Sequence, residues 1–149
     1  MYTGLLHLHS FLRWVGLLLM LITIVDSLVR IYRPFLNSER KLGLITMIIL
    51  HTQLLIGIAL YFVSPFIANA VESGNIMKDP VNRFYLVEHF LGMLIAIALV
   101  TIGYSKSKKQ SESWAKHKLI FTYYTLALIL ILISIPWPFR VVGEGRGWF

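Results

Sequence analysis

The chain contains no cysteine and few charged residues, and both shortages limit what it can be. Of its 149 residues only 14% are Asp, Glu, Lys or Arg, against about 25% in an ordinary soluble domain. The absence of cysteine excludes disulfide bonds, thiolate metal sites and covalent attachment of a c-type haem. Hydrophobic residues make up 57% of the chain. This length and composition predict one domain, residues 1–149, embedded in a membrane and surrounded by lipid.

Four apolar runs each reach the length of about 20 residues that a membrane-spanning helix needs. Because short connections join most of them, we predict an all-α fold, an integral membrane up-down four-helix bundle. The first run is too long for a cleaved signal peptide and lacks a basic start, so it is expected to remain as a span. The longest connection is expected to hold a short surface helix. The predicted spans cover approximately residues 4–31, 41–63, 81–104 and 115–136.

Basic residues are divided unequally between the two sides of the predicted bundle. Nine flank the spans on one side and four on the other, and an excess of Lys and Arg marks the cytoplasmic side. Both termini are therefore predicted to face outward, into the periplasm if the protein lies in a bacterial inner membrane. Orientation also accounts for the net charge of +7, so no nucleic-acid partner is expected. The larger group is Arg30, Arg33, Arg40, Lys41, Lys106, Lys108, Lys109, Lys116 and Lys118; the smaller is Lys78, Arg83, Arg140 and Arg146.

Two histidines inside the spans are the leading functional candidates, because ionisable residues are costly in lipid. His9 lies roughly 8 Å into the first span by helical rise, and His89 lies at a similar depth in the third. In an up-down bundle these two spans run parallel and are diagonal partners. Two imidazoles that face each other at one depth are the axial ligands that a b-type haem requires. We therefore predict His9 and His89 as the metal ligands of a non-covalent haem b near the outer face.

Small residues accompany both histidines along their helices. At 100° per residue, Gly16 continues the stripe of His9, and Gly92 and Gly103 lie close to the stripe of His89. We expect these residues to let a flat macrocycle approach the helix backbones.

Arginines near the two histidines are the candidate partners of the haem propionates. Arg13 lies one turn below His9, and Arg83 lies at the mouth of the third span. A bidentate arginine–carboxylate pair suits this task. A snorkelling or helix–helix contact is the alternative interpretation of Arg13.

The remaining polar residues allow several interpretations. His51 lies in the middle of the second span and could replace His9 as a ligand, hydrogen-bond to a haem or a quinone, relay protons, or hold two helices together. Asp26 and Arg30 are four residues apart and are expected to form an ion pair. His117 is expected at the membrane interface, because lysines flank it. A second haem between His51 and His117 is disfavoured, because their predicted depths differ by roughly 10 Å.

The segments "HLHSFLRW" and "RFYLVEHFLGM", within a four-span plan, resemble the small bacterial four-helix membrane proteins of the cytochrome b type, including the CopD-like and di-haem cytochrome b groups. The resemblance implies haem b and electron transfer, often with a quinone, a redox partner protein or a larger respiratory complex. By position it carries His9 and His89 over as axial ligands, with His51 as the substitute. A two-haem member should show two depth-matched pairs, and this chain departs from that pattern by showing one.

Two other functions fit the same residues. The chain could be a cofactor-free accessory or assembly subunit of a membrane complex, whose polar residues hold helices together. It could also be a metal or proton transporter that uses His9, His51, Glu88 and His89 as a polar path. No nucleophile–base pair or hydrolase motif is visible, so an electron carrier is favoured over a stand-alone enzyme.

Overall fold

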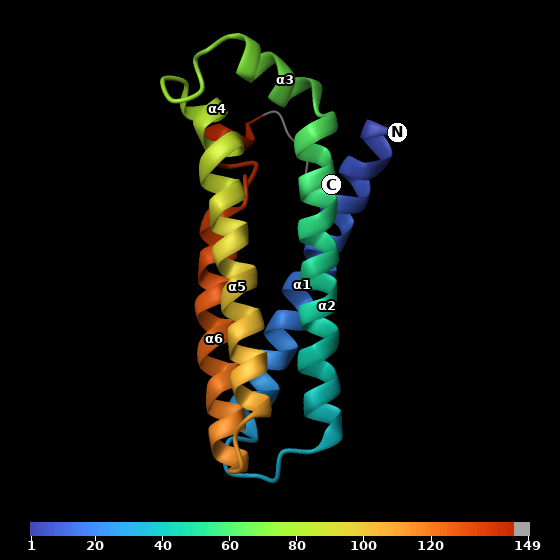
Figure 1. The fold of residues 1–149 in the computed structure, drawn as a ribbon, viewed down its shortest axis with the longest axis vertical. Coiled ribbons are helices and arrows are strands. Elements are labelled where there is room, and N and C mark those ends of the chain that lie inside the picture. Colours follow the sequence, from blue (N-terminus) through green and yellow to red (C-terminus); the bar gives the residue numbers. More distant parts are fainter. Residues whose placement is uncertain (145–149) are drawn as a thin grey trace.

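A computed structural model of the chain describes residues 1–144, and in that range the chain forms helices and loops without a strand (Figure 1). Four helices are long and apolar enough to cross a membrane, so the predicted all-α membrane bundle is confirmed. Arg146, which belongs to the smaller group of basic residues, lies outside the described residues. The elements are α1 (Tyr2–Val29), α2 (Asn37–Val63), α3 (Pro65–Glu72), α4 (Pro80–Arg83), the π-helix η1 (Phe84–Glu88), α5 (His89–Lys108), α6 (Ser113–Ser134) and the 3₁₀ helix η2 (Val141–Gly143).

The third span is built from three consecutive pieces, α4, η1 and α5, that together run from Pro80 to Lys108. Asp79 caps its start, because its Oδ1 accepts hydrogen bonds from the amides of Val81 and Asn82, each at 2.8 Å. Pro80 occupies the first helical position, where its missing N–H costs nothing. The short surface helix expected in the preceding loop is α3.

The four long helices are arranged as an up-down bundle. Helix α1 packs against α2 and α6, and α5 packs against α6 and α2, so α1 and α5 are diagonal partners as predicted. The N-terminus, α3 and α4 lie at one end, called here the N-terminal end (Figure 1). The α1–α2 and α5–α6 loops lie at the other end, called here the basic end because these loops and the adjoining helix turns carry the larger group of basic residues (Figure 1).

The middle of the bundle is an apolar core that separates the two ends. Met20, Leu50, Val100 and Ala127, one from each long helix, are at most 5% exposed. Beside them the hydroxyls of Thr23 on α1 and Thr46 on α2 lie 2.8 Å apart and tie these two helices together. The polar groups at the two ends of the bundle therefore form separate centres.

Two glycines of α5 serve helix packing rather than a ligand, which corrects the expectation that they would admit a macrocycle. A Cβ added at Gly92 would collide with Ser134 of α6, and one added at Gly103 would collide with Tyr123 of α6. Small residues allow two helix backbones to approach closely in this way. Gly92 and Gly103 are thus contact points between α5 and α6.

Candidate functional site

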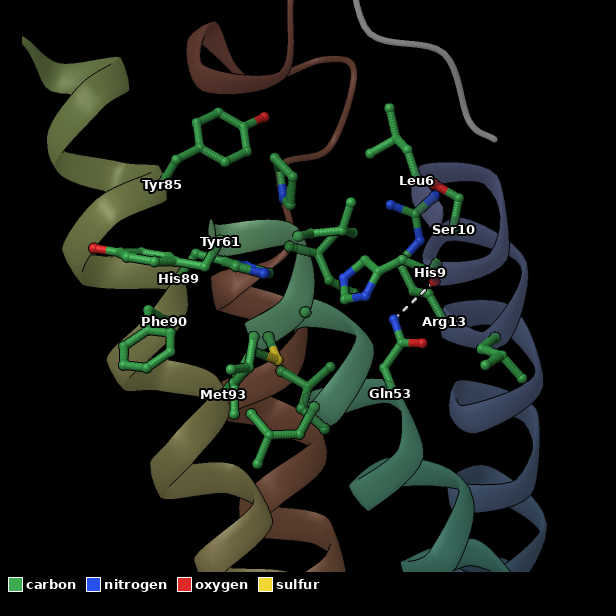
Figure 2. A pocket seen from close by; sticks show the side chains of 18 of the residues that line it. Leu6, His9, Ser10, Arg13, Gln53, Tyr61, Tyr85, His89, Phe90 and Met93 are labelled. Atoms are coloured by element: carbon green, nitrogen blue, oxygen red, sulfur yellow. Dashed lines mark hydrogen bonds between the residues drawn. The ribbon is translucent and has the colours of Figure 1, made fainter. Parts of the chain in front are cut away.

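The N-terminal end of the bundle contains a cavity of about 330 Å³. Its lining comes from α1, α2, α3, the third span and the end of α6 with the residues that follow it, and most of the lining side chains are apolar. A concave apolar cavity of this size with a few polar groups is typical of a cofactor or ligand site. The polar or ionisable side chains that reach it include His9, Arg13, Gln53, Tyr85 and His89 (Figure 2).

His9 and His89 point toward one another across this cavity, His9 from α1 and His89 from the first position of α5 (Figure 2). Their ring centroids are 6.5 Å apart, and the ring planes make an angle of 70°. The structure therefore brings together, from diagonal helices, the two histidines that the sequence predicted as a facing pair.

His89 is held in one orientation by the end of α6. Its Nδ1 lies 2.7 Å from the carbonyl oxygen of Ser134, and because a carbonyl only accepts, Nδ1 carries the proton. In the neutral ring Nε2 is then left with its lone pair. A backbone carbonyl that receives the second ring N–H is the usual support of a metal-binding histidine.

The Ser134 carbonyl is available to His89 because it belongs to the last turn of α6, and other groups satisfy its neighbours. The last carbonyls of a helix have no partner within the helix. Here Trp137 Nε1 donates to Leu132 O at 2.9 Å, and Arg140 donates to Ile133 O at 2.6 Å and to Ile135 O at 3.1 Å. The bond from His89 to Ser134 completes this set.

The π-helix η1 directly precedes His89 and lies against the cavity. A π-helix is rare and often marks a functional site. Its Tyr85 lines the cavity and donates from its hydroxyl to Val142 O at 2.9 Å. Tyr61 of α2 donates to Leu86 O of η1 at 3.3 Å. Side-chain bonds from two directions therefore fix the backbone that positions His89.

Helix α2 supports His9 through a bond to the backbone of His9. Gln53 of α2 donates from Nε2 to the carbonyl oxygen of His9 at 2.7 Å (Figure 2). On the same face of α2, Gly57 leaves room for the ring, because a Cβ there would stand 3.1 Å from His9 Cε1. The buried Nδ1 of His9 has no hydrogen-bond partner among the described residues.

The structure separates the two arginines predicted to bind propionates. Arg13 lines the cavity on the side of His9 (Figure 2), and its guanidinium also lies 5.4 Å from the Trp14 ring. Arg83 is outside the cavity and forms an exposed ion pair with Glu88, with Nε 2.8 Å from Oε1. Arg13 therefore lines the cavity, and Arg83 is paired with Glu88 outside it.

His51 lies outside the cavity, between α2 and α5. Its Nδ1 is 2.8 Å from Met47 O, and its Nε2 is 3.3 Å from Thr101 Oγ1. Both nitrogens are thus engaged with protein groups, and the arrangement corresponds to the helix-linking interpretation.

His117 is fully buried inside the bundle at the basic end, and the prediction that it lies at the depth of the membrane interface stays a prediction. The flanking Lys116 and Lys118 reach other rings, those of Phe35 and Trp114, while the His117 ring turns inward and packs edge-on to Phe35 at 4.8 Å. The structure does not place it near the cavity.

A network of charged side chains lies at the basic end near His117. The expected pair of Asp26 and Arg30 is confirmed, with 2.7 Å between Arg30 Nε and Asp26 Oδ1. Arg30 also pairs with the buried Glu39 at 3.3 Å. Glu39 Oε2 in turn accepts the Leu36 amide at 2.6 Å at the start of α2.

Two facing imidazoles could serve as the axial ligands of a haem, whereas a bare metal ion would need more protein ligands. Among residues 1–144 no group of three or more His, Cys, Asp or Glu residues is placed to hold a metal, but a porphyrin supplies four of the six ligands itself. An imidazole nitrogen ligates a first-row metal at about 2 Å and the ring centre lies about 1 Å further, so two axial imidazoles stand about 6 Å apart. The 6.5 Å separation of His9 and His89 fits this requirement.

Comparisons with known proteins do not assign the site. No protein-family model matches the chain, and neither a curated protein nor a solved structure matches it.

Proposed function

We propose that this protein is a membrane-bound b-type cytochrome that holds one haem b between His9 and His89 and transfers electrons. The observation that carries the proposal is the facing pair of imidazoles on diagonal helices, 6.5 Å apart, within an otherwise apolar cavity. The N–H of His89 donated to Ser134 O leaves Nε2 available as a ligand. A bound haem would supply reversible one-electron chemistry.

The other residues of the cavity have separate tasks in this proposal. Arg13 would neutralise a propionate with its guanidinium, as arginine does for carboxylates elsewhere. Apolar side chains such as Leu54, Met93 and Ile97 exclude water and provide the low dielectric around the cofactor. Tyr85, fixed by its bond to Val142, closes the cavity on the side of η1.

The proposal places the haem near the periplasmic face of a bacterial inner membrane. The larger group of basic residues lies at the opposite end of the bundle, and such residues are retained on the cytoplasmic side. Electrons would then be exchanged at the N-terminal end with a redox partner protein or a larger respiratory complex.

The absorption spectrum of protein purified from cells with an ample haem supply tests the proposal. We expect a Soret band, a sharp α band after reduction with dithionite, and haem b that is extracted by acidified acetone, because the attachment is not covalent. Purified protein that is folded by circular dichroism and has no Soret band would favour a cofactor-free accessory subunit and would contradict the cytochrome. A haem that stays with the chain during extraction would contradict it as well.

A further inference from the structure

We infer that the two histidines are unequal ligands: His89 stays on the iron, whereas His9 is exchangeable, so the reduced protein binds a neutral diatomic gas of the carbon monoxide class in place of His9. This inference rests on the proposed function, because it needs a haem between the two rings. It adds reversible gas binding to electron transfer.

The rings differ first in what holds their outer nitrogen. His89 Nδ1 donates to Ser134 O at 2.7 Å, whereas His9 Nδ1 is buried without a hydrogen-bond partner in the described part of the chain. A hydrogen bond to the second nitrogen fixes the ring and raises its basicity as a ligand, and the loss of such a bond typically weakens metal binding by about 10–100-fold. His9 is therefore expected to be the weaker ligand and the one less firmly oriented.

The helix that carries His89 is also held more firmly than the helix that carries His9. His89 begins α5 directly after η1, whose backbone is tied to α2 through Tyr61 and to η2 through Tyr85. His9 lies in the first turns of α1, which starts without a side-chain cap and leans away from α5 and α6 toward the N-terminus (Figure 1). A Cβ added at the nearby Gly4 would meet nothing within 4 Å. His9 is thus the ligand whose helix can move away from the iron more easily.

The exchange is balanced and needs no further reactant. His9 releases the iron, so that one iron–nitrogen bond breaks, and one iron–carbon bond to carbon monoxide forms. No electron is transferred, and His9 remains neutral. Carbon monoxide suits the cavity because it is small and uncharged and most of the lining side chains are apolar.

Gly57 allows a matched test of the missing hydrogen bond. A Cβ at this position would lie 3.1 Å from His9 Cε1 and 3.7 Å from Nδ1. Gly57→Ala and Gly57→Ser therefore add the same steric contact, and only serine adds a hydroxyl within reach of the free Nδ1. Serine is expected to give His9 the support that His89 already has.

The experiment follows carbon monoxide binding to the dithionite-reduced protein by stopped-flow absorbance. We expect a carbon monoxide adduct in the wild type, with a rate that becomes independent of gas concentration because the release of His9 limits it. His9→Ala should keep its haem on His89 and bind the gas at least tenfold faster, reaching the same final spectrum. Gly57→Ser should bind it about tenfold more slowly than Gly57→Ala.

Three results would overturn the inference and leave the proposed function in place: a wild-type haem that forms no adduct, a His9→Ala protein that has lost its haem, or equal rates in the two Gly57 variants. A wild-type protein that contains no haem would instead remove the proposed function, and the inference with it.

Discussion

His89→Ala is expected to yield a folded protein that purifies without haem, even from cells with an ample haem supply. The substitution removes the ligand that the end of α6 orients through Ser134 O, and His9 alone has no such support. Removal of a metal ligand costs more than the roughly 10–100-fold loss that follows removal of its supporting group. The ratio of Soret absorbance to protein, measured after one purification protocol for all variants, checks this expectation.

His51→Ala is the matched control for this experiment. It also removes a half-buried histidine from a span, but one that contacts Met47 and Thr101 outside the cavity, so its haem content is expected to equal that of the wild type. Imidazole added to the His89→Ala protein together with haemin should restore a low-spin spectrum, because it can occupy the vacated ring position. A His89→Ala protein with the haem content and spectrum of the wild type would refute the ligand assignment.

Gly103→Val is expected to destabilise the bundle by about 3 kcal/mol, near the upper end of the cost of overpacking. A Cβ at this position would overlap Tyr123 next to its backbone rather than at the end of a flexible side chain. Rotation of the tyrosine side chain cannot relieve that overlap, so α5 and α6 must move apart. Thermal unfolding in detergent, followed by circular dichroism, measures the effect.

Gly4→Val provides the control, because a Cβ at Gly4 would meet nothing within 4 Å. It introduces the same side chain into a span and is expected to leave the unfolding temperature nearly unchanged. Gly103 lies toward the basic end of α5, away from the cavity, so the folded fraction of Gly103→Val should keep the spectrum of the wild type. Equal unfolding temperatures for the two valine variants would show that the close approach of α5 and α6 does not contribute to stability.

The bundle could be predicted from the sequence because lipid imposes simple rules on it. Each span can be recognised by its length and its hydropathy. The rise per residue of a helix then placed His9 and His89 at similar depths. Short loops then made α1 and α5 diagonal partners, which the structure confirms. The pairing of the two rings followed from these three facts.

The supporting groups could not be predicted, because they depend on how distant elements meet. The ligand-orienting carbonyl of Ser134 is a backbone atom, so no residue type signals it. Gln53 was visible as a polar residue within an apolar run, but its partner, the backbone of His9, was not. The ion pair between Arg83 and Glu88, five residues apart, spans the π-helix η1, whose presence the sequence did not indicate.

His117 shows a second limit, that of arguing from neighbours in the sequence. Adjacent helix positions point about 100° apart, so the flanking Lys116 and Lys118 can reach outward to aromatic rings while the histidine turns into the bundle. The same geometry explains why Gly92 and Gly103 face α6 instead of the cavity. Helical phase decides these positions, and it was fixed only once the helices were packed.

Electron paramagnetic resonance of the oxidised protein tests the central claim most directly, since it reports both the number of haem irons and their axial ligands. We predict one low-spin ferric haem per chain with the signature of two imidazole ligands, and no such signal from the His9→Ala/His89→Ala double variant. A wild type without haem iron, or a double variant that keeps the signal of the wild type, would contradict the placement of a haem between His9 and His89.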